Sequence, residues 1–272
     1  MSSILTNNGA IVALQTLKNV NSNLNKAQSE IATGLRVASA KDNSSSWSIA
    51  STMKSDIQAL KTLGNSLTSA GAMVATASKA TEDVAELVKQ IQAKVVQAQN
   101  PEADVAKLTA EVAALAGTIT SIAGSAQYNG INLVNTGSTA EDITVGITRS
   151  AAGAVGSQTF SSGSADLAAV ATAIIGIADI SAAAALDTID TQLDAVNTAA
   201  ATFGAAQARI EAQANFVTKQ ADSLTAGVSA LVDADMEEAS ARLQALQTQQ
   251  QLGIQALSIA NQAPSAVLSL FR

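Results

Sequence analysis

The longest apolar pattern in the chain lies in its second half. Between Leu186 and Leu231, apolar or small residues recur every three or four positions and so fall on one side of a helix. The predicted seam also includes one polar residue, Gln207. A helix over this range would be about 68 Å long at roughly 1.5 Å per residue, longer than a compact domain of this size holds. The pattern therefore predicts coiled-coil packing between long helices.

After a change of phase, the same spacing continues from Val232 through Met236 to Ala260. Gly253 lies on this seam, where the lack of a side chain permits close helix approach. Elsewhere in a helix a glycine costs about 1 kcal/mol. From Ala239 to Phe271 the only charged residue is Arg242. A helix in water needs more charge, and a membrane span tolerates fewer Gln, Ser and Asn residues, so we expect protein to cover this segment.

The first half of the chain has a matching pattern. Leu17, Leu24 and Ile31 are seven residues apart, which predicts a first helix. A second helix is predicted from Met53 to Ala98, with a phase shift near Thr81, and a third from Val105 to Ile122.

Capping and turn residues predict where these helices begin and end. Asp42, Asn43 or Ser44 is expected to cap the second helix. For the third helix we expect Asn100 as the N-cap, Pro101 as the first helical residue and favourable acidic residues after it. The "YNG" turn at 128–130 should end it.

Residues 131–165 are rich in Gly, Ser and Thr and differ from the helical segments. Alternation at Ile143, Val145 and Ile147 predicts a strand, followed by turns at Gly153 and Gly156 and a second strand in "SQTFSS". Helix should resume near residue 166, with an irregularity at 176–182. The predicted fold is mainly α, with long antiparallel helices in coiled-coil packing and a small β-hairpin region.

Composition narrows the function. Hydrophobic residues make up 47% of the chain but aromatics only 2%, which suits helices packed through small side chains rather than a wide core. Only 14% of residues are charged, so much of the surface is expected to be covered. The net charge of −7 argues against nucleic acid binding. The absence of His and Cys removes the usual catalytic base and metal ligands, so we expect no enzyme, cofactor or metal site.

The acidic clusters are better explained as solvated or capping residues than as catalytic or metal-binding sites. Pairs such as Glu82–Asp83 and Glu141–Asp142 suit solvated surfaces better than acid–base catalysis. The run "DADMEE" at 233–238 lacks EF-hand spacing, so a capping role is favoured over calcium binding. No window reaches 18 unbroken apolar residues, so membrane insertion is not expected.

Four motifs, in order along the chain, resemble those of bacterial flagellins. They are "KAQSEIATGLRVASAKDNSSSWSIA" at 26–50, "QYNGINLV" at 127–134, "FGAAQARIEAQANFV" at 203–217 and the ending from 233 to 272. The resemblance implies a secreted, extracellular structural subunit of the flagellar filament, exported without a cleaved signal. The segment between the "YNG" turn at 128–130 and the returning helix is too short for the outer domains (D2, D3) of many family members.

The family plan implies a division of the chain into five segments. They are an N-terminal D0 helix at 1–44, D1 helices at 45–135, a β-hairpin region at 136–165, a C-terminal D1 helix at 166–232 and a C-terminal D0 helix at 233–272. The implied partners are further copies of the chain, sister flagellins, an export chaperone, the filament cap and hook-junction proteins.

The same plan assigns assembly to the D0 helices, whose free ends should be disordered in the monomer. The expected assembly residues are Leu14, Leu17, Leu24, Ile31, Leu35, Leu243, Leu246, Gln250, Gly253, Leu257, Ala260, Leu268, Leu270 and Phe271. The expected D0–D1 connector contains Gly34, Arg36, Lys41 and Asp42.

This chain departs from the family at two places. Trp47 stands in a segment that is usually small-residue rich, and we expect it at a rod contact or partly buried at a helix start. Gln90 and Gln92 stand where receptor-detected flagellins carry Arg, and Lys94 where they carry Leu. We therefore expect poor activation of the vertebrate innate receptor. The Ser/Thr-rich hairpin and residues 181–202 are candidate O-glycosylation surfaces.

Two alternatives to a filament subunit remain from sequence. A hook–filament junction protein shares the terminal plan, although the ending "SIANQAP…SLFR" favours flagellin. A secreted coiled-coil adhesin or binding module would form a stable dimer with ordered ends.

Overall fold

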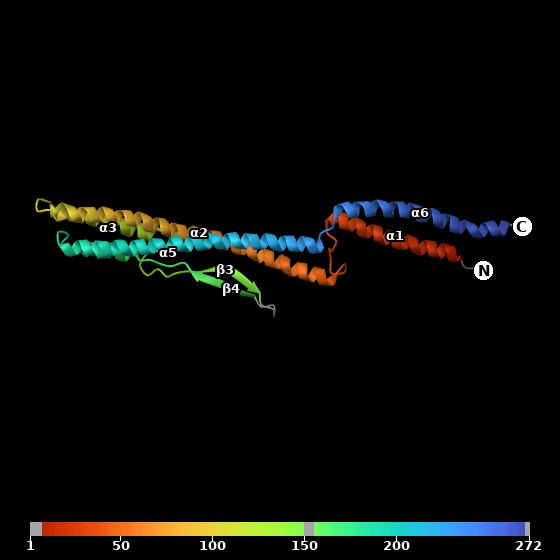
Figure 1. Cartoon of the computed structure of the whole chain (residues 1–272), viewed down its shortest axis with the longest axis horizontal. Helices are drawn as coiled ribbons and strands as arrows, with labels where there is room; N and C mark the ends of the chain where they lie inside the picture. Colours follow the sequence, from red (N-terminus) through yellow and green to blue (C-terminus); the bar gives the residue numbers. More distant parts are fainter. Residues whose placement is uncertain (1–6, 150–154, 270–272) are drawn as a thin grey trace. The chain divides into compact units, whose positions relative to one another are not determined.

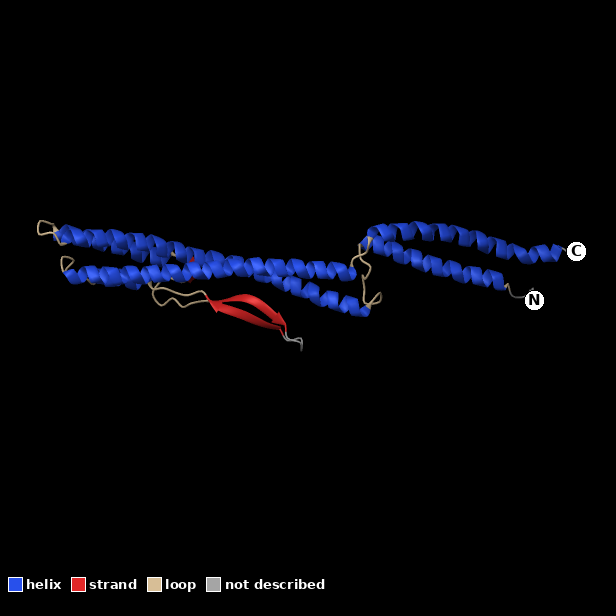
Figure 2. Ribbon diagram, in the orientation of Figure 1, coloured by secondary structure: helices blue, strands red, loops and turns tan. Residues whose placement is uncertain are grey.

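A computed structural model describes the backbone of residues 7–149 and 155–269, and side chains over the same ranges except at 155 and 263–269. Helices dominate, and two short antiparallel β-ribbons accompany them (Figures 1 and 2). The chain divides into two compact units, unit 1 with residues 1–57 and 223–272 and unit 2 with residues 58–222. The described helices are α1 (Asn8–Thr33), α2 (Ser44–Ala98), α3 (Val105–Ser125), α4 (Leu167–Ile175), α5 (Ala183–Val232) and α6 (Met236–Ser269).

Unit 1 is built on the pairing of α1 with α6, called here the terminal pair (Figure 1). Its core contains Val20, Leu24 and Ala27 from α1 and Leu246 from α6, with Leu243 packed against them. These residues are three or four positions apart within each helix, which places them on one face. The terminal pair is thus held together by the coiled-coil seam that the spacing predicts.

A second apolar cluster lies where α1 and α5 end. Four buried residues form its centre, and partly buried hydrophobic side chains from α2, α5 and the loop after α1 surround them. The buried members are Val37, Ala50, Val228 and Val232; Leu35, Met53, Ile57 and Leu231 pack against them.

Backbone hydrogen bonds join the two loops beside this cluster. Gly34 ends α1 in the left-handed conformation, with φ of 70°, and its N–H donates to the Glu30 carbonyl. The Arg36 and Val37 N–H groups both donate to the Val232 carbonyl, at 2.7 and 3.2 Å. The Ala234 N–H returns a bond to the Gly34 carbonyl at 2.9 Å. The loop after α1 is therefore fixed to the loop before α6.

In unit 2, α2 and α5 run antiparallel. Gly71 of α2 lies against Ile210 of α5, and Gln92 further along α2 donates a hydrogen bond to Asp190 earlier in α5. Helix α3 packs on α4. Its buried residues Leu108, Val112, Ala116, Ile119 and Ala123 form one stripe.

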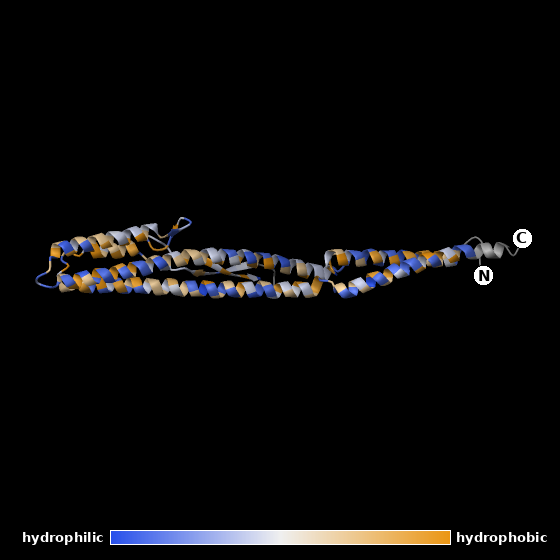
Figure 3. Cartoon of the chain, turned by 90° about the horizontal axis from the view of Figure 1, so that it is seen from above, coloured by the Kyte–Doolittle hydropathy of each residue, from blue (hydrophilic) through white to orange (hydrophobic). Residues whose placement is uncertain are grey.

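Within the described part of the chain, α3 is the one helix that is long and apolar enough to cross a membrane. A core helix of a soluble protein has the same length and composition, so these two properties alone do not identify a span. Hydrophobic and hydrophilic positions are interspersed along the long helices rather than separated into segments (Figure 3).

Within the described residues the β-structure consists of two ribbons, of which β3–β4 is the one plainly visible in Figure 2. Strands β1 (Gln127–Tyr128) and β2 (Ile131–Asn132) are joined by Asn129 and Gly130, both at positive φ, as a two-residue hairpin turn requires. Strands β3 (Asp142–Arg149) and β4 (Val155–Ser161) pair with a register shift between Thr144 and Gly146.

The structure confirms most of the predicted elements. The two strands of the hairpin region are β3 and β4, and the helix irregularity at 176–182 is the gap between α4 and α5. Asn43 is the residue that caps α2, since its side-chain oxygen accepts from the Ser46 N–H at 3.0 Å. Asp235 caps α6 by accepting from the N–H groups of Glu237 and Glu238.

Several local predictions are wrong. Asp104, rather than Asn100, caps α3, and Pro101 lies in the preceding turn, because the Asp104 carboxylate accepts from the Lys107 N–H. Gln207 is exposed and Ala206 is buried in its place on α5. Met236, predicted on the α6 seam, is exposed because it begins the helix. Gly156 lies within β4 instead of a turn, and Gly153 lies outside the described residues.

Candidate functional site

The terminal pair brings together most of the residues expected to drive assembly. Leu24 and Leu246 lie in its core, Leu243 packs against that core, and Leu35 packs in the second cluster. Leu17, Ile31, Gln250, Gly253, Leu257 and Ala260 are half-buried along the same pair. Leu268 belongs to α6, but its side chain, together with Leu270 and Phe271, lies outside the described residues.

Close helix approach occurs at Gly253. A β-carbon built on Gly253 would lie 3.2 Å from the Leu17 Cδ1 atom, tighter than ordinary van der Waals contact. The glycine therefore leaves room for Leu17 where the two helices approach. This contact is the physical role that the seam position of Gly253 predicted.

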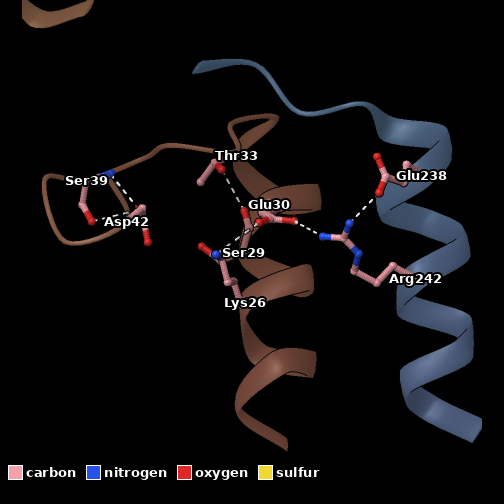
Figure 4. A network of polar contacts seen from close by, with 8 residues as sticks. All are labelled: Lys26, Ser29, Glu30, Thr33, Ser39, Asp42, Glu238 and Arg242. Carbon is pink, nitrogen blue, oxygen red and sulfur yellow. Dashed lines mark hydrogen bonds and ion pairs between the residues drawn. The ribbon is translucent and has the colours of Figure 1, made fainter. Parts of the chain in front are cut away.

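One charged network crosses the terminal pair (Figure 4). The Glu30 side chain is only 9% exposed, and its carboxylate lies 4.0 Å from Lys26 Nζ and 3.9 Å from an Arg242 Nη atom. Arg242 also contacts the Glu238 carboxylate at 2.5 Å. A buried carboxylate without a cation would be costly. Arg242, the only charge in the low-charge part of α6, thus has a defined partner on α1.

Further along the pair, the polar contacts between the helices are made by neutral amide side chains. Gln250 donates to the Asn21 side-chain oxygen at 2.7 Å. Asn7 donates to the Ala260 carbonyl, also at 2.7 Å. Both bonds join α6 to the N-terminal segment without the desolvation cost of a charge.

The far part of the pair leaves large apolar side chains uncovered. Leu14 is 44% exposed, so this predicted assembly residue faces outward from the seam. Others on the same two helices are more exposed still. They are Ile11, Val12, Leu252, Ile254 and Ile259, with exposed fractions from 54% to 70%. Exposed apolar side chains on these two paired helices make them a candidate protein-binding surface.

The predicted connector residues all lie between α1 and α2. Gly34 caps α1, and Arg36 donates from its guanidinium to the Leu231 carbonyl. The Ser39 hydroxyl and N–H both donate to the Asp42 carboxylate, and these bonds lower the pKa of Asp42. Lys41 is exposed.

The segment predicted to differ from receptor-detected flagellins lies on α2 in unit 2. Gln90 is exposed, Gln92 donates to Asp190 of α5, and Lys94 forms a 2.6 Å ion pair with Glu111 of α3. Two of the three side chains are therefore engaged within the same chain.

Sequence reasoning missed three contributors to the terminal pair. Val20 and Ala27 are buried seam residues, and Glu30 is the buried carboxylate. The isolated charge of Arg242 was a usable signal, because a lone cation on an uncharged helix calls for an acidic partner on the opposing helix. Ala27 gave no such signal, since alanine is common on every face of these helices.

The family models and the curated relatives that this chain matches all belong to one family. Residues 4–139 match the bacterial flagellin N-terminal helical region and residues 186–271 the C-terminal helical region. A flagellin of Brucella melitensis is 41% identical over 281 residues, covering all of both chains. Flagellin C of Rhizobium meliloti is 37% identical over 320 residues with the same full coverage.

Other relatives agree. Flagellin FljM of Caulobacter vibrioides is 34% identical, covering all of this chain and 99% of its own. The crystal structure of Bacillus cereus flagellin matches 59% of this chain at 22% identity with a TM-score of 0.46, and the assignment does not depend on it. Both terminal helical regions and the full-length relatives show that this chain belongs to the bacterial flagellin family, the filament subunits of the bacterial flagellum.

Proposed function

We propose that the terminal pair is the polymerisation element of this flagellin. The chain is an extracellular, non-enzymatic filament subunit, and its family assembles by self-polymerisation. The observation that carries the proposal is the exposed apolar surface of α1 and α6. Residues such as Leu252 and Ile259, at 58% and 70% exposed, are left uncovered by the described residues of the single chain and need a cover from another molecule.

The mechanism is coupled ordering and assembly. The terminal pair has a narrow core of small and medium side chains, so an isolated copy gains little from pairing against the entropy of ordering. Contact with neighbouring copies adds buried apolar area at about 25 cal/mol per Å². We expect the ends to be disordered in the monomer and ordered in the filament.

Seeded elongation tests the proposal. Purified protein is added to short filament fragments, and growth is followed by negative-stain electron microscopy. Full-length protein should elongate the seeds, whereas a core of residues 40–232 should not. Equal behaviour of the two proteins would contradict the proposal.

A matched pair of substitutions sharpens this test. Ile259→Asp places a charge on the exposed apolar face of α6 and should stop elongation. Thr139→Asp places the same charge on an exposed loop and should leave elongation unchanged.

The remaining family features follow the same proposal. D0 would comprise 1–44 and 233–272, and D1 would comprise 45–135 and 166–232 with the hairpin region at 136–165. The expected partners beyond the chain itself are sister flagellins, an export chaperone, the filament cap and hook-junction proteins. Only 46 residues, 140 to 185, separate the two family-matched regions, which agrees with a chain that lacks outer domains.

Weak activation of the vertebrate innate receptor is a separate proposal. It is supported by the absence of Arg at positions 90 and 92 and by the engagement of Gln92 and Lys94 within the chain. Receptor-reporter activation at the potency of a strong flagellin would contradict it. O-linked sugars on the hairpin or on 181–202 would appear as excess in the intact mass of purified filaments.

A further inference from the structure

We propose that Trp47 of one copy docks into a groove on unit 2 of a neighbouring copy in the filament. The proposal rests on self-polymerisation and names a specific contact within it. The two contact surfaces, Trp47 and the groove, lie on different parts of the chain, so each copy can use one surface toward each of two neighbours. Such heterologous contacts generate open helical assemblies rather than closed dimers.

The groove lies between α2, the β1–β2 turn and β3. Its volume is about 620 Å³, within the range of pockets that hold small ligands, so it can accept an indole ring. The apolar lining includes Leu63, Met73, Ile131, Ile143 and Ile147. Ile131 is 38% exposed, so apolar surface reaches the mouth of the groove.

Trp47 has the properties of a docking side chain. It is the only tryptophan in the chain and is 41% exposed in the first turn of α2. Ile49 beside it is 50% exposed. Tryptophan buries a large area at low entropic cost and dominates many protein interfaces.

The occupant of the groove must come from another copy. Trp47 and one wall of the groove are on the same helix, and the first groove-lining residue of α2 is Ala59. Twelve residues of helix correspond to about 18 Å at roughly 1.5 Å per residue. The Trp47 side chain cannot span that distance within its own chain.

Charges on the two surfaces are complementary. Glu141 and Asp142 line the groove, and neither forms an ion pair with another described residue. Lys54, seven residues after Trp47 and so on the same side of α2, also has no ion pair within residues 7–149 and 155–269. Docking of Trp47 would bring Lys54 toward the carboxylates and give the indole N–H an acceptor.

Phe216 of a neighbouring copy is a competing occupant of the groove, since it is also an exposed aromatic residue, with 57% of its surface accessible. Its ring has no N–H to satisfy a carboxylate at the mouth. The comparison of Trp47 with Phe216 is therefore part of the test.

Tryptophan fluorescence, excited at the red edge of the absorption band so that Tyr128 does not contribute, gives the first measurement, because Trp47 is the only tryptophan in the chain. On polymerisation we expect a blue shift and at least a threefold fall in the acrylamide quenching constant. Filaments that form with unchanged emission and quenching would overturn the inference and leave the proposed function intact. Failure to form filaments would instead count against the proposed function.

Cysteine pairing identifies the groove, because the natural chain has no cysteine. Ser48→Cys, beside Trp47, is copolymerised with Ser69→Cys, on the groove wall, and the mixture is oxidised. A disulfide-linked heterodimer is expected, whereas Ser48→Cys mixed with Thr202→Cys should give none. Absence of the first heterodimer would overturn the proposal.

A groove-filling variant completes the test. Ser66→Arg fills the groove and repels Lys54 of the neighbouring copy. We expect either that Trp47 stays accessible to the quencher or that elongation fails. Gln58→Arg, on α2 but outside the groove, is the matched control. Normal Ser66→Arg filaments with protected Trp47 would overturn the assignment. So would loss of elongation in Phe216→Ala but not in Trp47→Ala.

Discussion

Gly253 of α6 faces Leu17 of α1, and a β-carbon at position 253 would lie 3.2 Å from Leu17 Cδ1. Leu17 is half-buried, so its terminal methyl can move by a few tenths of an ångström. Gly253→Ala should then be tolerated, since the gain of about 1 kcal/mol in helix propensity offsets the crowding. Gly253→Leu should cost about 1–3 kcal/mol through overpacking. The temperature at which filaments melt measures both effects.

The matched control is Gly117 of α3, where an added β-carbon meets nothing within 4 Å. Gly117→Leu should not lower the melting temperature through α3 packing. If Gly253→Leu and Gly117→Leu behave alike, Gly253 is not a close-approach position.

Removal of the Arg242 charge should weaken the terminal pair. Arg242→Met keeps the aliphatic stem but leaves the Glu30 carboxylate with Lys26 alone, at 4.0 Å. Because Arg242 is half exposed, the expected loss is about 1 kcal/mol. Filament melting temperature is the measurement. Glu30→Gln combined with Arg242→Met should cost less than the sum of the single changes, since the two groups interact.

Charge introduced among the neutral amides should impair assembly. Gln250→Lys would replace the neutral amide that donates to Asn21 with a half-buried cation beside α1. Combined with Gln255→Lys, it should shorten filaments or prevent growth, as judged by microscopy of seeded reactions. Filaments of normal length would refute this expectation. Gln250→Glu alone tests whether charge of either sign is harmful.

Acid should loosen the start of α3. Hydrogen bonds from the Lys107 side chain and N–H lower the pKa of Asp104. A lowered folded-state pKa means that the stabilisation is present above the unfolded-state value, about 3.9, and is lost as pH falls through the folded-state value. The protection of the amides of residues 105–108 against exchange, corrected for the intrinsic rate at each pH, should therefore fall in that range. Asp104→Asn, which caps without titrating, should flatten the dependence.

The helices were predictable because their seams repeat over many turns. A wrong seam assignment at one position, such as Gln207 where Ala206 is the buried residue, does not change the helix that the whole pattern predicts. The prediction of the α3 cap was wrong because Asn100 and Asp104 both precede an apolar run, and Pro101 favours the earlier helix start. The β1–β2 hairpin was missed because its strands have two residues each, too short for an alternation pattern.

The candidate site was predictable to a similar degree. Charge depletion identified α6 as covered, heptad spacing predicted α1 as a helix, and the family plan assigned both to assembly. The buried position of Glu30 was not predictable, since Lys26 four residues earlier suggests an ordinary surface pair. Its burial depends on how α6 lies against α1, which local sequence does not specify.

The uncharged length of α6 has a consequence for the conditions in which the filament works. Ions in solution weaken attractions between exposed charges, and screen them almost fully beyond a Debye length of about 8–10 Å at physiological ionic strength. Beyond Arg242, the described contacts of the terminal pair are apolar side chains and neutral amides, on which that screening does not act. The cohesion of these helices should thus stay nearly constant between dilute and saline surroundings.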